Sequence, residues 1–440
     1  MKTVSSIIMI LFSIFLIFLA KKDIKKMFWV SYLFIIGIPI GSTNVIMEYV
    51  NLINIKSVSI NGFHVIISIL TIYSIIELVK KRKTISWNKS YIKYIVFCVG
   101  IFTGLVIGLL HHKNFISDGQ KYVMMMLYIF SIFVIFGNDF DIEKWIRYTI
   151  YGVSFGCLFS IFVNTLGDSM NFFYIEDLHK RSTETAFVVY SANITLLIII
   201  YVFYGFLNSP VKKSKIPEYV CMAVCMYYNL FCAHNRTIIF VMAILIIIVL
   251  VLSISKDNWK STQFRVKIIA TVLVIAMVAA VMVVTKNELL MRLLNTDIFS
   301  KNDNGVTRFY TVKYYLRKLL KEPAGVGFGT PLPLINQWGR FHGESLFTDN
   351  AYVNVAMKTG VIGLAAFVFM IIVPVVKFFK NHGFNRKNVI IGLTYLGYLF
   401  LVTVMTGQFT NTYPITLFSI SFIYVFSVYG ETNKSEADVI

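Results

Sequence analysis

The sequence is short of charged residues and has long stretches that contain none. Only 14% of its 440 residues are charged, whereas a soluble chain of this length carries roughly a quarter. Hydrophobic residues make up 57% of the chain and the mean hydropathy is +0.72. Apolar runs long enough to cross a bilayer recur from end to end. The composition excludes a soluble globular protein and predicts an all-α polytopic membrane protein.

Cysteine is also scarce, and its placement excludes two classes of site. All five cysteines lie inside apolar runs, and no His or carboxylate stands at ligand spacing from the Cys221 and Cys225 pair. Buried cysteines of this kind behave as small hydrophobic residues. We therefore expect no disulfide framework and no metal site at these residues. No cofactor is expected either. The chain has no internal repeat, low-complexity tract or soluble module.

Acidic residues are few, so the 41 Lys and Arg leave a formal charge of +19. Nucleic-acid binding is not the explanation, because the cations cluster in short segments between apolar runs. The positive-inside rule places such segments in the cytoplasm. The clusters are Lys21 to Lys26, Lys80 to Lys93, Lys212 to Lys215, Lys256 to Lys267 and Lys377 to Lys387.

The apolar runs predict thirteen spans, within a range of 12–14, in a single integral membrane domain of residues 1–440. The first run, Val4 to Ala20, lacks a cleavage site and is followed by KKDIKK, so we interpret it as a retained span with its N-terminus outside. Alternation then places the C-terminus in the cytoplasm. The predicted spans are 4–20, 27–41, 59–79, 94–110, 122–137, 148–167, 186–207, 218–233, 236–254, 268–285, 351–376, 388–407 and 414–430.

The interval 286–350 is the only long polar stretch between spans, and we predict that it is an extracytoplasmic loop. It is rich in Lys and Arg, but long loops are largely exempt from the charge rule. Two short amphipathic helices are predicted within it, at Asn287 to Leu294 and Val306 to Leu320.

The second of these helices has two faces and one informative arginine. Arg308 falls nearly in line with the apolar stripe, so we interpret it as pointing inward. The alternative is an interfacial helix whose first-turn Arg extends to the membrane surface. The apolar stripe is Val312, Tyr315, Leu316 and Leu319, and the opposite face, Lys313, Arg317 and Lys321, is expected to meet water or lipid headgroups.

A glycine-rich segment, GVGFG, follows this helix. Gly325, Gly327 and Gly329 permit a close-approach turn. No strand precedes them and no Walker lysine follows, so nucleotide binding is disfavoured. Two readings stay open: an anion-binding nest of backbone N–H groups, or a loop that folds back to the membrane.

Polar residues are concentrated just before the span that begins at Ala351. Asp349 and Asn350 are typical of a helix N-cap, and a helix N-terminus also favours an anion. His342 is a candidate general base, although a lone loop histidine is more often simply solvated. Arg340 lies close by and is a candidate supporting residue.

Another cation, Arg236, stands in the tight hairpin His234-Asn235-Arg236-Thr237, between two apolar runs. An arginine at the mouth of a helix bundle is costly unless it binds a counter-charge.

Together these features resemble the O-antigen ligase/polymerase superfamily, and within it the Wzy-type polymerases of O-antigen and capsule repeat units. The resemblance rests on the Arg-Thr that opens a span at Arg236, the long late loop with Arg308, the GVGFG segment, and TDNAYVNVAMKTGVIGL opening the next span. It covers roughly Arg236 to Leu364. The ligase branch has a His where this chain has Asp349, and this departure favours a polymerase.

The resemblance implies a metal-independent glycosyltransferase of the bacterial inner membrane that uses an undecaprenyl-diphosphate-linked donor and acceptor. Arg236 and Arg308 would bind the diphosphate, and Asp349 or His342 would be the base. Arg340, Asn350, Gly325, Gly327 and Gly329 would support them. The implied partners are membrane lipid, a chain-length regulator and a flippase, with no nucleic acid.

Two alternatives stay open. A flippase for lipid-linked oligosaccharides would predict charged residues within spans and a repeat between halves. A ligase would transfer finished glycan to a different acceptor.

Overall fold

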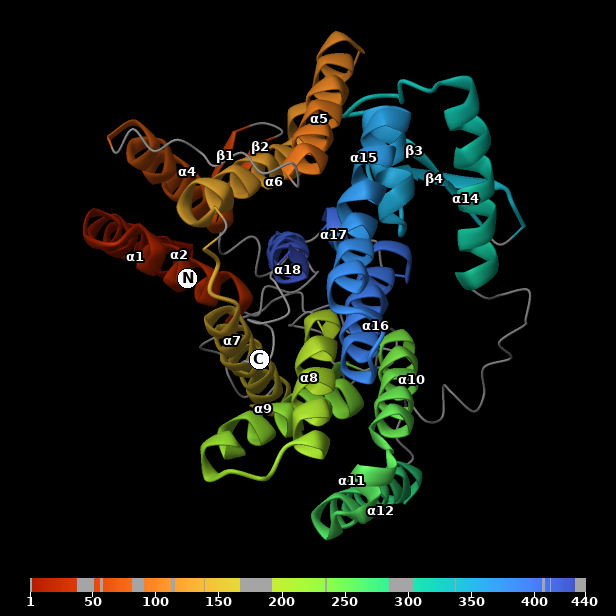
Figure 1. The fold of residues 1–440 in the computed structure, drawn as a ribbon. Helices are drawn as coiled ribbons and strands as arrows, with labels where there is room; N and C mark the ends of the chain where they lie inside the picture. The colour runs from red at the N-terminus through yellow and green to blue at the C-terminus, as the bar shows by residue number, and fades with distance from the viewer. Residues whose placement is uncertain are drawn as a thin grey trace.

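In the computed structural model of the chain, the described residues are 2–37, 51–55, 58–80, 91–111, 115–137, 139–166, 192–233, 236–284, 304–336, 338–405, 408–411 and 413–431. The helices among them form one bundle, seen nearly end-on for several members in Figure 1. A helix overlaps each of the thirteen predicted spans. These helices are α1 (Lys2–Lys22), α2 (Ile24–Gly37), α4 (Gly62–Lys80), α5 (Ile92–His111), α6 (Phe115–Phe136), α7 (Ile142–Leu166), α8 (Thr195–Asn208), α9 (Ile216–Tyr227), α10 (Arg236–Ser253), α12 (Thr262–Val284), α15 (Ala351–His382), α16 (Arg386–Phe400) and α18 (Tyr413–Glu431).

Within the described part of the chain, eight helical segments are long and apolar enough to cross a membrane. Thr195–Asn208 and Thr237–Ser253 are shorter apolar helices. Side chains on the outer surfaces of the bundle are apolar and exposed, as in α12, where Leu273 is 63% exposed. The predicted fold class, an all-α polytopic membrane protein, is confirmed.

The remaining described elements are short helical segments and two β-hairpins. Neither hairpin was predicted, and the predicted helix Asn287 to Leu294 lies outside the described residues. The short helical segments are α11 (Lys256–Lys260), α14 (Asn304–Lys321), α17 (Gln408–Asn411), η4 (Ala192–Ile194), η5 (Lys213–Lys215), η6 (Tyr228–Ala233) and η7 (Leu401–Met405). The antiparallel hairpins pair β1 (Asn51–Ile55) with β2 (Val58–Asn61), and β3 (Leu332–Ile335) with β4 (Phe341–Ser345).

The interface between α5 and α15 is built on small residues. Gly100, Gly104 and Gly108 recur every four residues, so they share one face of α5. A Cβ on Gly100 would lie 2.6 Å from the Cα of Gly363, and one on Gly104 would lie 2.3 Å from the carbonyl oxygen of Lys358. Glycine at these positions lets the two backbones approach closely, as is common between membrane helices.

Helix α15 is broken at Gly360, which has a φ of 72°. This left-handed conformation is open to glycine and costly for other residues. The next residue, Val361, donates its N–H to the carbonyl oxygen of Pro323 at 2.9 Å. The segment after α14 thus packs against the break, and residues 351–359 form a short helix of their own at the start of α15.

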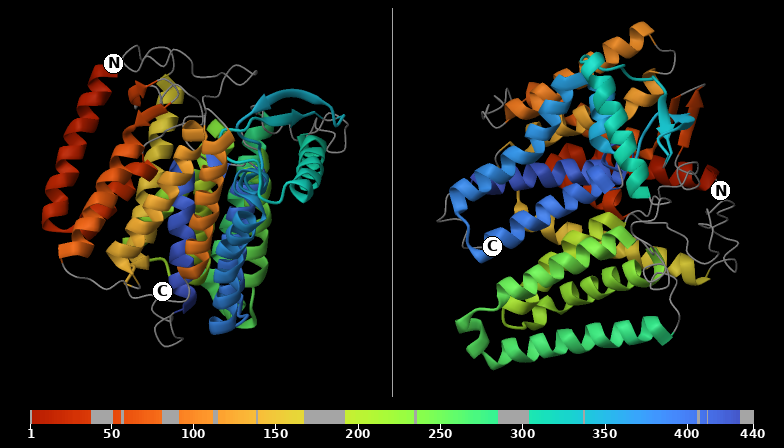
Figure 2. Two further views of the ribbon diagram at one scale, coloured as in Figure 1. Left: turned by 90° about the horizontal axis from the view of Figure 1, so that it is seen from above. Right: turned by 90° about the vertical axis from the view of Figure 1, so that its right-hand side faces the viewer.

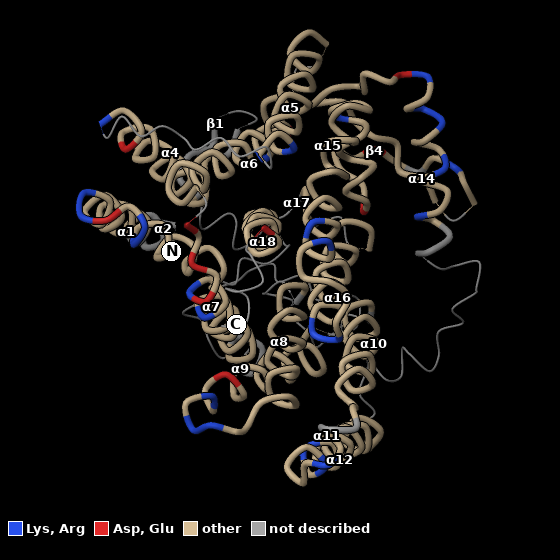
Figure 3. Tube along the Cα trace, in the orientation of Figure 1, with Lys and Arg blue, Asp and Glu red and all other residues tan. Residues whose placement is uncertain are grey.

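Figure 2 shows how the ends of the bundle differ. In its left panel the start of α1 and the hairpin β3–β4 lie at one end, and the C-terminus lies at the other. Lys and Arg recur along α14 (Figure 3), and in α1 and α4 the charged residues lie in the first or last turn. The part of the late polar loop that the structure describes, from residue 304 on, therefore lies on the same side as the start of α1.

Candidate active site

A cavity of about 370 Å³ lies beside the N-terminus of α15, where α14 and the hairpin β3–β4 meet. The two arms of the hairpin and the first turns of α14 form its walls. The residues that line it are Thr307, Arg308, Thr311, Pro333, Leu334, Ile335, Ser345, Phe347, Thr348, Asp349 and Asn350. Two predicted site residues, Arg308 and Asp349, therefore share one cavity, and Asn350 lies in its wall.

Arg308 points inward, as its position on the helix predicts. Its side chain is half-buried, and Nη1 lies 3.9 Å from the Sδ of Met405. Its Nε is buried and has no hydrogen-bond partner among the described residues. A buried guanidinium donor without an acceptor is costly. Because Arg308 also lines the cavity, its charge can be neutralised by an anion there.

The predicted apolar stripe of this helix is only partly correct. Tyr315 and Leu319 are buried, and Val312 is half-buried. The prediction that Leu316 is buried is wrong, because its side chain is 54% exposed. The helix is covered on two sides only, and Leu316 lies on the third side. Burial raises the pKa of Tyr315, so its hydroxyl stays protonated and donates to the carbonyl oxygen of Pro333 at 2.7 Å. This bond fixes α14 to the hairpin that closes the cavity.

The turn that carries Asp349 is held by a buried amide. Asn354 accepts hydrogen bonds at Oδ1 from the backbone N–H and the hydroxyl of Thr348, at 2.8 and 3.0 Å. Its Nδ2 donates to the Thr348 carbonyl and to Thr410. Asn350 caps the helix, as predicted, by accepting from the N–H of Val353 at 3.1 Å. Asp349, between these fixed residues, is exposed to solvent.

The glycine segment packs on the start of α15 and on α5. Gly325, Gly327 and Gly329 have φ values of 79°, 79° and 85°. Val326 donates to the Met357 carbonyl at 2.7 Å, and Phe328 donates to the Gly104 carbonyl at 3.2 Å. These bonds fit a loop that folds back against the membrane helices, and they use N–H groups that an anion nest would need.

Beneath this loop lies an ion pair that sequence reasoning missed. The ammonium group of Lys358 pairs with Asp118 of α6, and both side chains are fully buried. Asp118 also accepts the N–H of Gly329 at 2.7 Å, and Lys358 donates to the Thr330 carbonyl at 2.8 Å. The available signal was Lys358, a charged residue within the predicted span 351–376, which marks a paired or functional group. Asp118 lies between two predicted spans and gave no such signal.

A second missed cation lies behind the cavity wall. The ammonium group of Lys121, on α6, stands 4.6 Å from the ring centre of Phe347. This is cation–π geometry, and Phe347 lines the cavity.

The other predicted site residues are placed as follows. Arg340 is exposed next to the hairpin and does not line the cavity. His342 lies in β4 opposite the irregular pairing between Leu334 and Ile335, and its side chain lies outside the described part. Arg236 is the first residue of α10, which packs against η7. Met405 of η7 touches Arg308, but the side chain of Arg236 and the hairpin residues 234 and 235 are not described.

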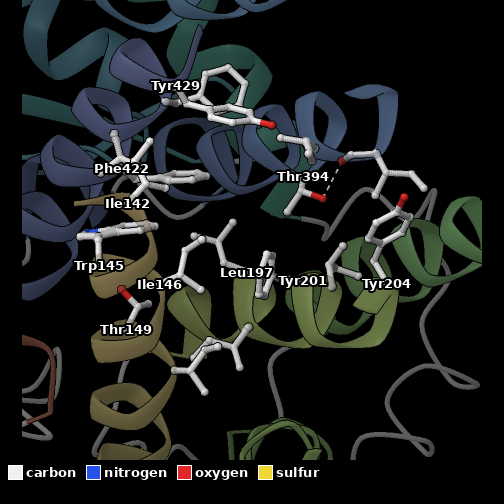
Figure 4. Close-up of a pocket in the computed structure, with 17 residues that line it drawn as sticks. Ile142, Trp145, Ile146, Thr149, Leu197, Tyr201, Tyr204, Thr394, Phe422 and Tyr429 are labelled. Carbon is white, nitrogen blue, oxygen red and sulfur yellow. Dashed lines mark hydrogen bonds between the residues drawn. The ribbon is translucent and has the colours of Figure 1, made fainter. Parts of the chain in front are cut away.

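A second cavity, of about 140 Å³, has a different character (Figure 4). It lies among α7, α8, α16 and α18, near the C-terminal end of α18, and thus at the other end of the bundle. No charged side chain lines it, and aromatic and aliphatic groups such as Trp145, Ile146 and Tyr204 fill its walls. It cannot neutralise a charged substrate, so the cavity at Arg308 is the better candidate site.

Comparison with known proteins identifies the region that contains the first cavity. No curated protein matches the chain. The family model of O-antigen ligases (Wzy_C) matches residues 221–368, which include α10, α14, the hairpin β3–β4 and the start of α15. The matched family implies membrane proteins of polysaccharide biosynthesis that act on lipid-linked polysaccharides. Residues 221–368 of the protein are thus similar to the O-antigen ligase family.

Proposed function

We propose that the protein is a polymerase that joins oligosaccharide repeat units carried on a polyprenyl diphosphate of the undecaprenyl type. The observation that carries the proposal is the shared cavity of Arg308 and Asp349. The guanidinium of Arg308 can bind a diphosphate, and the carboxylate of Asp349 can accept a proton from a sugar hydroxyl. In this proposal the cavity faces away from the cytoplasm of a bacterial inner membrane, with the N-terminus outside and the C-terminus inside.

The reaction needs little covalent chemistry from the protein. The acceptor hydroxyl attacks the anomeric carbon of the donor glycan, and a new carbon–oxygen bond forms. The bond from that carbon to the diphosphate oxygen breaks, and its electron pair leaves with the diphosphate. Because the leaving group is already a good one, charge stabilisation and positioning supply most of the catalysis.

Arg308 would bind the departing diphosphate, since a guanidinium binds phosphate oxygens bidentately. Arg236 is proposed as a second diphosphate ligand, because α10 packs on the η7 segment that Arg308 touches. The arginines would neutralise the charge that a metal ion neutralises in other phosphate enzymes, which is the basis for proposing a metal-independent reaction.

We assign the proton transfer to Asp349 in preference to His342, because Asp349 lines the same cavity as Arg308. An exposed carboxylate beside the attacking hydroxyl can accept its proton as the bond forms. His342 stays the alternative base, and Arg340 a peripheral contact to the glycan.

The test uses purified protein in nanodiscs with polyprenyl-diphosphate-linked repeat units and no other acceptor. We expect polymer ladders from the unaltered protein, and single repeat units only from Arg308→Ala. Removing one charge-stabilising donor typically costs about 10²–10³ in kcat. Arg265→Ala is the matched control, since Arg265 is exposed on α12, which lies apart from α14 and the hairpin β3–β4 in Figure 1. Normal ladders from Arg308→Ala would refute the proposal.

The same assay separates the alternatives. A ligase makes no polymer until a different acceptor is added. A flippase makes none under either condition, and its depletion in cells traps lipid-linked units on the inner leaflet, whereas loss of a polymerase lets them cross. A chain-length regulator would change the length of the ladder and not its presence.

A further inference from the structure

Helix α14 has one face that nothing in the described chain covers. Its first covered face packs inward: Tyr315 meets Leu332 of β3 and residues at the start of α15, and Leu319, on the same side of the helix, is also buried. Arg308 belongs to the same side. The buried side chains of α14 lie on this face.

The second covered face meets the hairpin β3–β4. The ring of Tyr314 packs edge-on against Phe341, with 5.3 Å between ring centres. Gly339, in the turn between the strands, lies against the ring of Tyr310. The hairpin therefore covers the side of α14 that carries Tyr310 and Tyr314.

The third face combines large apolar side chains with cations. Phe309, Leu316 and Leu320 fall within an arc of roughly 40° at 100° per residue, and they are 63%, 54% and 83% exposed. Lys313 and Arg317 are exposed along one edge of this arc. No acidic residue lies between Asn304 and Lys321. We call these five residues the α14 lipid face.

The placement of α14 turns this face toward the membrane. The helix lies crosswise to the spanning helices in Figure 1, beside the start of α15. In the left panel of Figure 2 the hairpin lies on the outer side of α14, and α14 is level with the ends of the spanning helices. With the bundle on one side and the hairpin above, the remaining side points down and outward, where a bilayer surrounding the bundle would lie.

We infer that the α14 lipid face docks on anionic phospholipid at the membrane surface. Phe309, Leu316 and Leu320 enter the boundary between headgroups and acyl chains, and Lys313 and Arg317 pair with lipid phosphates. Interfacial amphipathic helices bind in this way, and cations close to the surface are attracted to anionic lipid. Charge complementarity and position select lipid over a second copy of the chain or a soluble partner.

Docking of the α14 lipid face would also set the depth of Arg308 in the membrane; this consequence rests on the proposed function. Arg308 and the lipid face are on the same rigid helix, so docking holds Arg308 at the level of lipid headgroups. A diphosphate carried by a membrane lipid is confined to that level. The docked helix would therefore present the cavity to the substrate without a further conformational step.

The experiment measures contact with lipid directly and needs no activity. A fluorescent thiol label is placed on Leu320→Cys and, as the matched control, on Trp338→Cys in the hairpin turn, where the side chain is 64% exposed. The native cysteines are buried or half-buried, and labelled unaltered protein gives the background. In nanodiscs of phospholipid brominated on its acyl chains, we expect quenching at position 320 several-fold greater than at position 338.

A second arm tests the charge requirement. With Lys313→Gln and Arg317→Gln together, quenching at position 320 should become equal in nanodiscs of phosphatidylglycerol and phosphatidylcholine, whereas the unaltered face should be quenched more in phosphatidylglycerol. Equal, weak quenching at positions 320 and 338 would overturn the proposal. The proposal would also be overturned if the label at position 320 were quenched weakly in nanodiscs with two copies of the chain and strongly in nanodiscs with one copy. A second copy of the chain would then be the occupant of this face. A failed polymer assay leaves these results unchanged, so the two proposals fail separately.

Discussion

Asp118 of α6 and Lys358 of α15 form an ion pair that is fully buried, although 240 positions separate them in the chain. The pair also holds the glycine segment, since Asp118 accepts the N–H of Gly329 and Lys358 donates to the Thr330 carbonyl. Two spanning helices and the loop that leads to the cavity are thus joined at one point.

Breaking this pair on one side should destabilise the protein. Lys358→Met leaves the Asp118 carboxylate buried and unpaired, and such a loss typically costs about 3–5 kcal/mol. The double variant Asp118→Leu with Lys358→Met removes both charges and should recover much of the loss. Thermal unfolding in detergent measures both variants. Equal destabilisation of the single and double variants would show that packing, and not charge pairing, sets the stability here.

The break in α15 makes a second prediction. Gly360 and Gly383 have nearly the same φ, 72° and 73°, but only Gly360 is crowded: its Cβ would lie 2.7 Å from the Ala324 carbonyl, whereas Gly383 has no neighbour within 4 Å. Gly383→Ala should cost about 1–2 kcal/mol from conformation alone. Gly360→Ala should cost about 1–3 kcal/mol more, because a backbone must move. Thermal unfolding of the two variants, compared directly, checks the difference, and equal losses would contradict the packing of the loop into the break.

The sequence predicts the membrane architecture well because apolar length is a local property. All thirteen predicted spans overlap helices, and the cap at Asn350 and the inward Arg308 follow from turn chemistry and helix periodicity. These features need only residues within a turn or two of one another.

Features that depend on tertiary contact were missed. Leu316 belongs to the predicted apolar stripe but is exposed, because periodicity does not say how much of a helix its neighbours cover. The sequence could not predict that Lys358 pairs with Asp118, because the two residues are 240 positions apart. The spacing of Gly100, Gly104 and Gly108 was a readable signal for close helix packing, but it does not name α15 as the helix that approaches. The hairpin β3–β4 is short, and Pro333 weakens its strand pattern.

Asn354 gives a prediction that separates positioning from substrate binding. Its amide fixes Thr348 and therefore the turn that carries Asp349. Asn354→Ala should leave these polar groups unpaired and loosen the turn, so kcat for polymerisation should fall by about tenfold or more while KM changes little. The control is Asn208→Ala, which removes an amide that bonds Ser253 elsewhere in the bundle. A rise in KM with unchanged kcat would instead place Asn354 in substrate binding.

Asp349 is the residue on which the proposed chemistry depends most directly. It lines the cavity with Arg308 and is exposed there, so Asp349→Asn keeps the shape of the site and removes only the proton acceptor. We expect kcat to fall by about 10²–10⁴, the usual contribution of a general base, while binding of the lipid-linked donor persists because Arg308 is untouched. Single-turnover assays with purified lipid-linked repeat units measure the two effects separately.

The matched control for this prediction is Glu344→Gln, because Glu344 is an exposed carboxylate on β4 that does not line the cavity. It should keep nearly full activity. His342→Gln addresses the alternative base: if the histidine accepts the proton, this variant loses kcat and Asp349→Asn does not. The prediction fails if Asp349→Asn and Glu344→Gln have equal rates, since a carboxylate that takes the proton of the attacking hydroxyl cannot be replaced by an amide without loss.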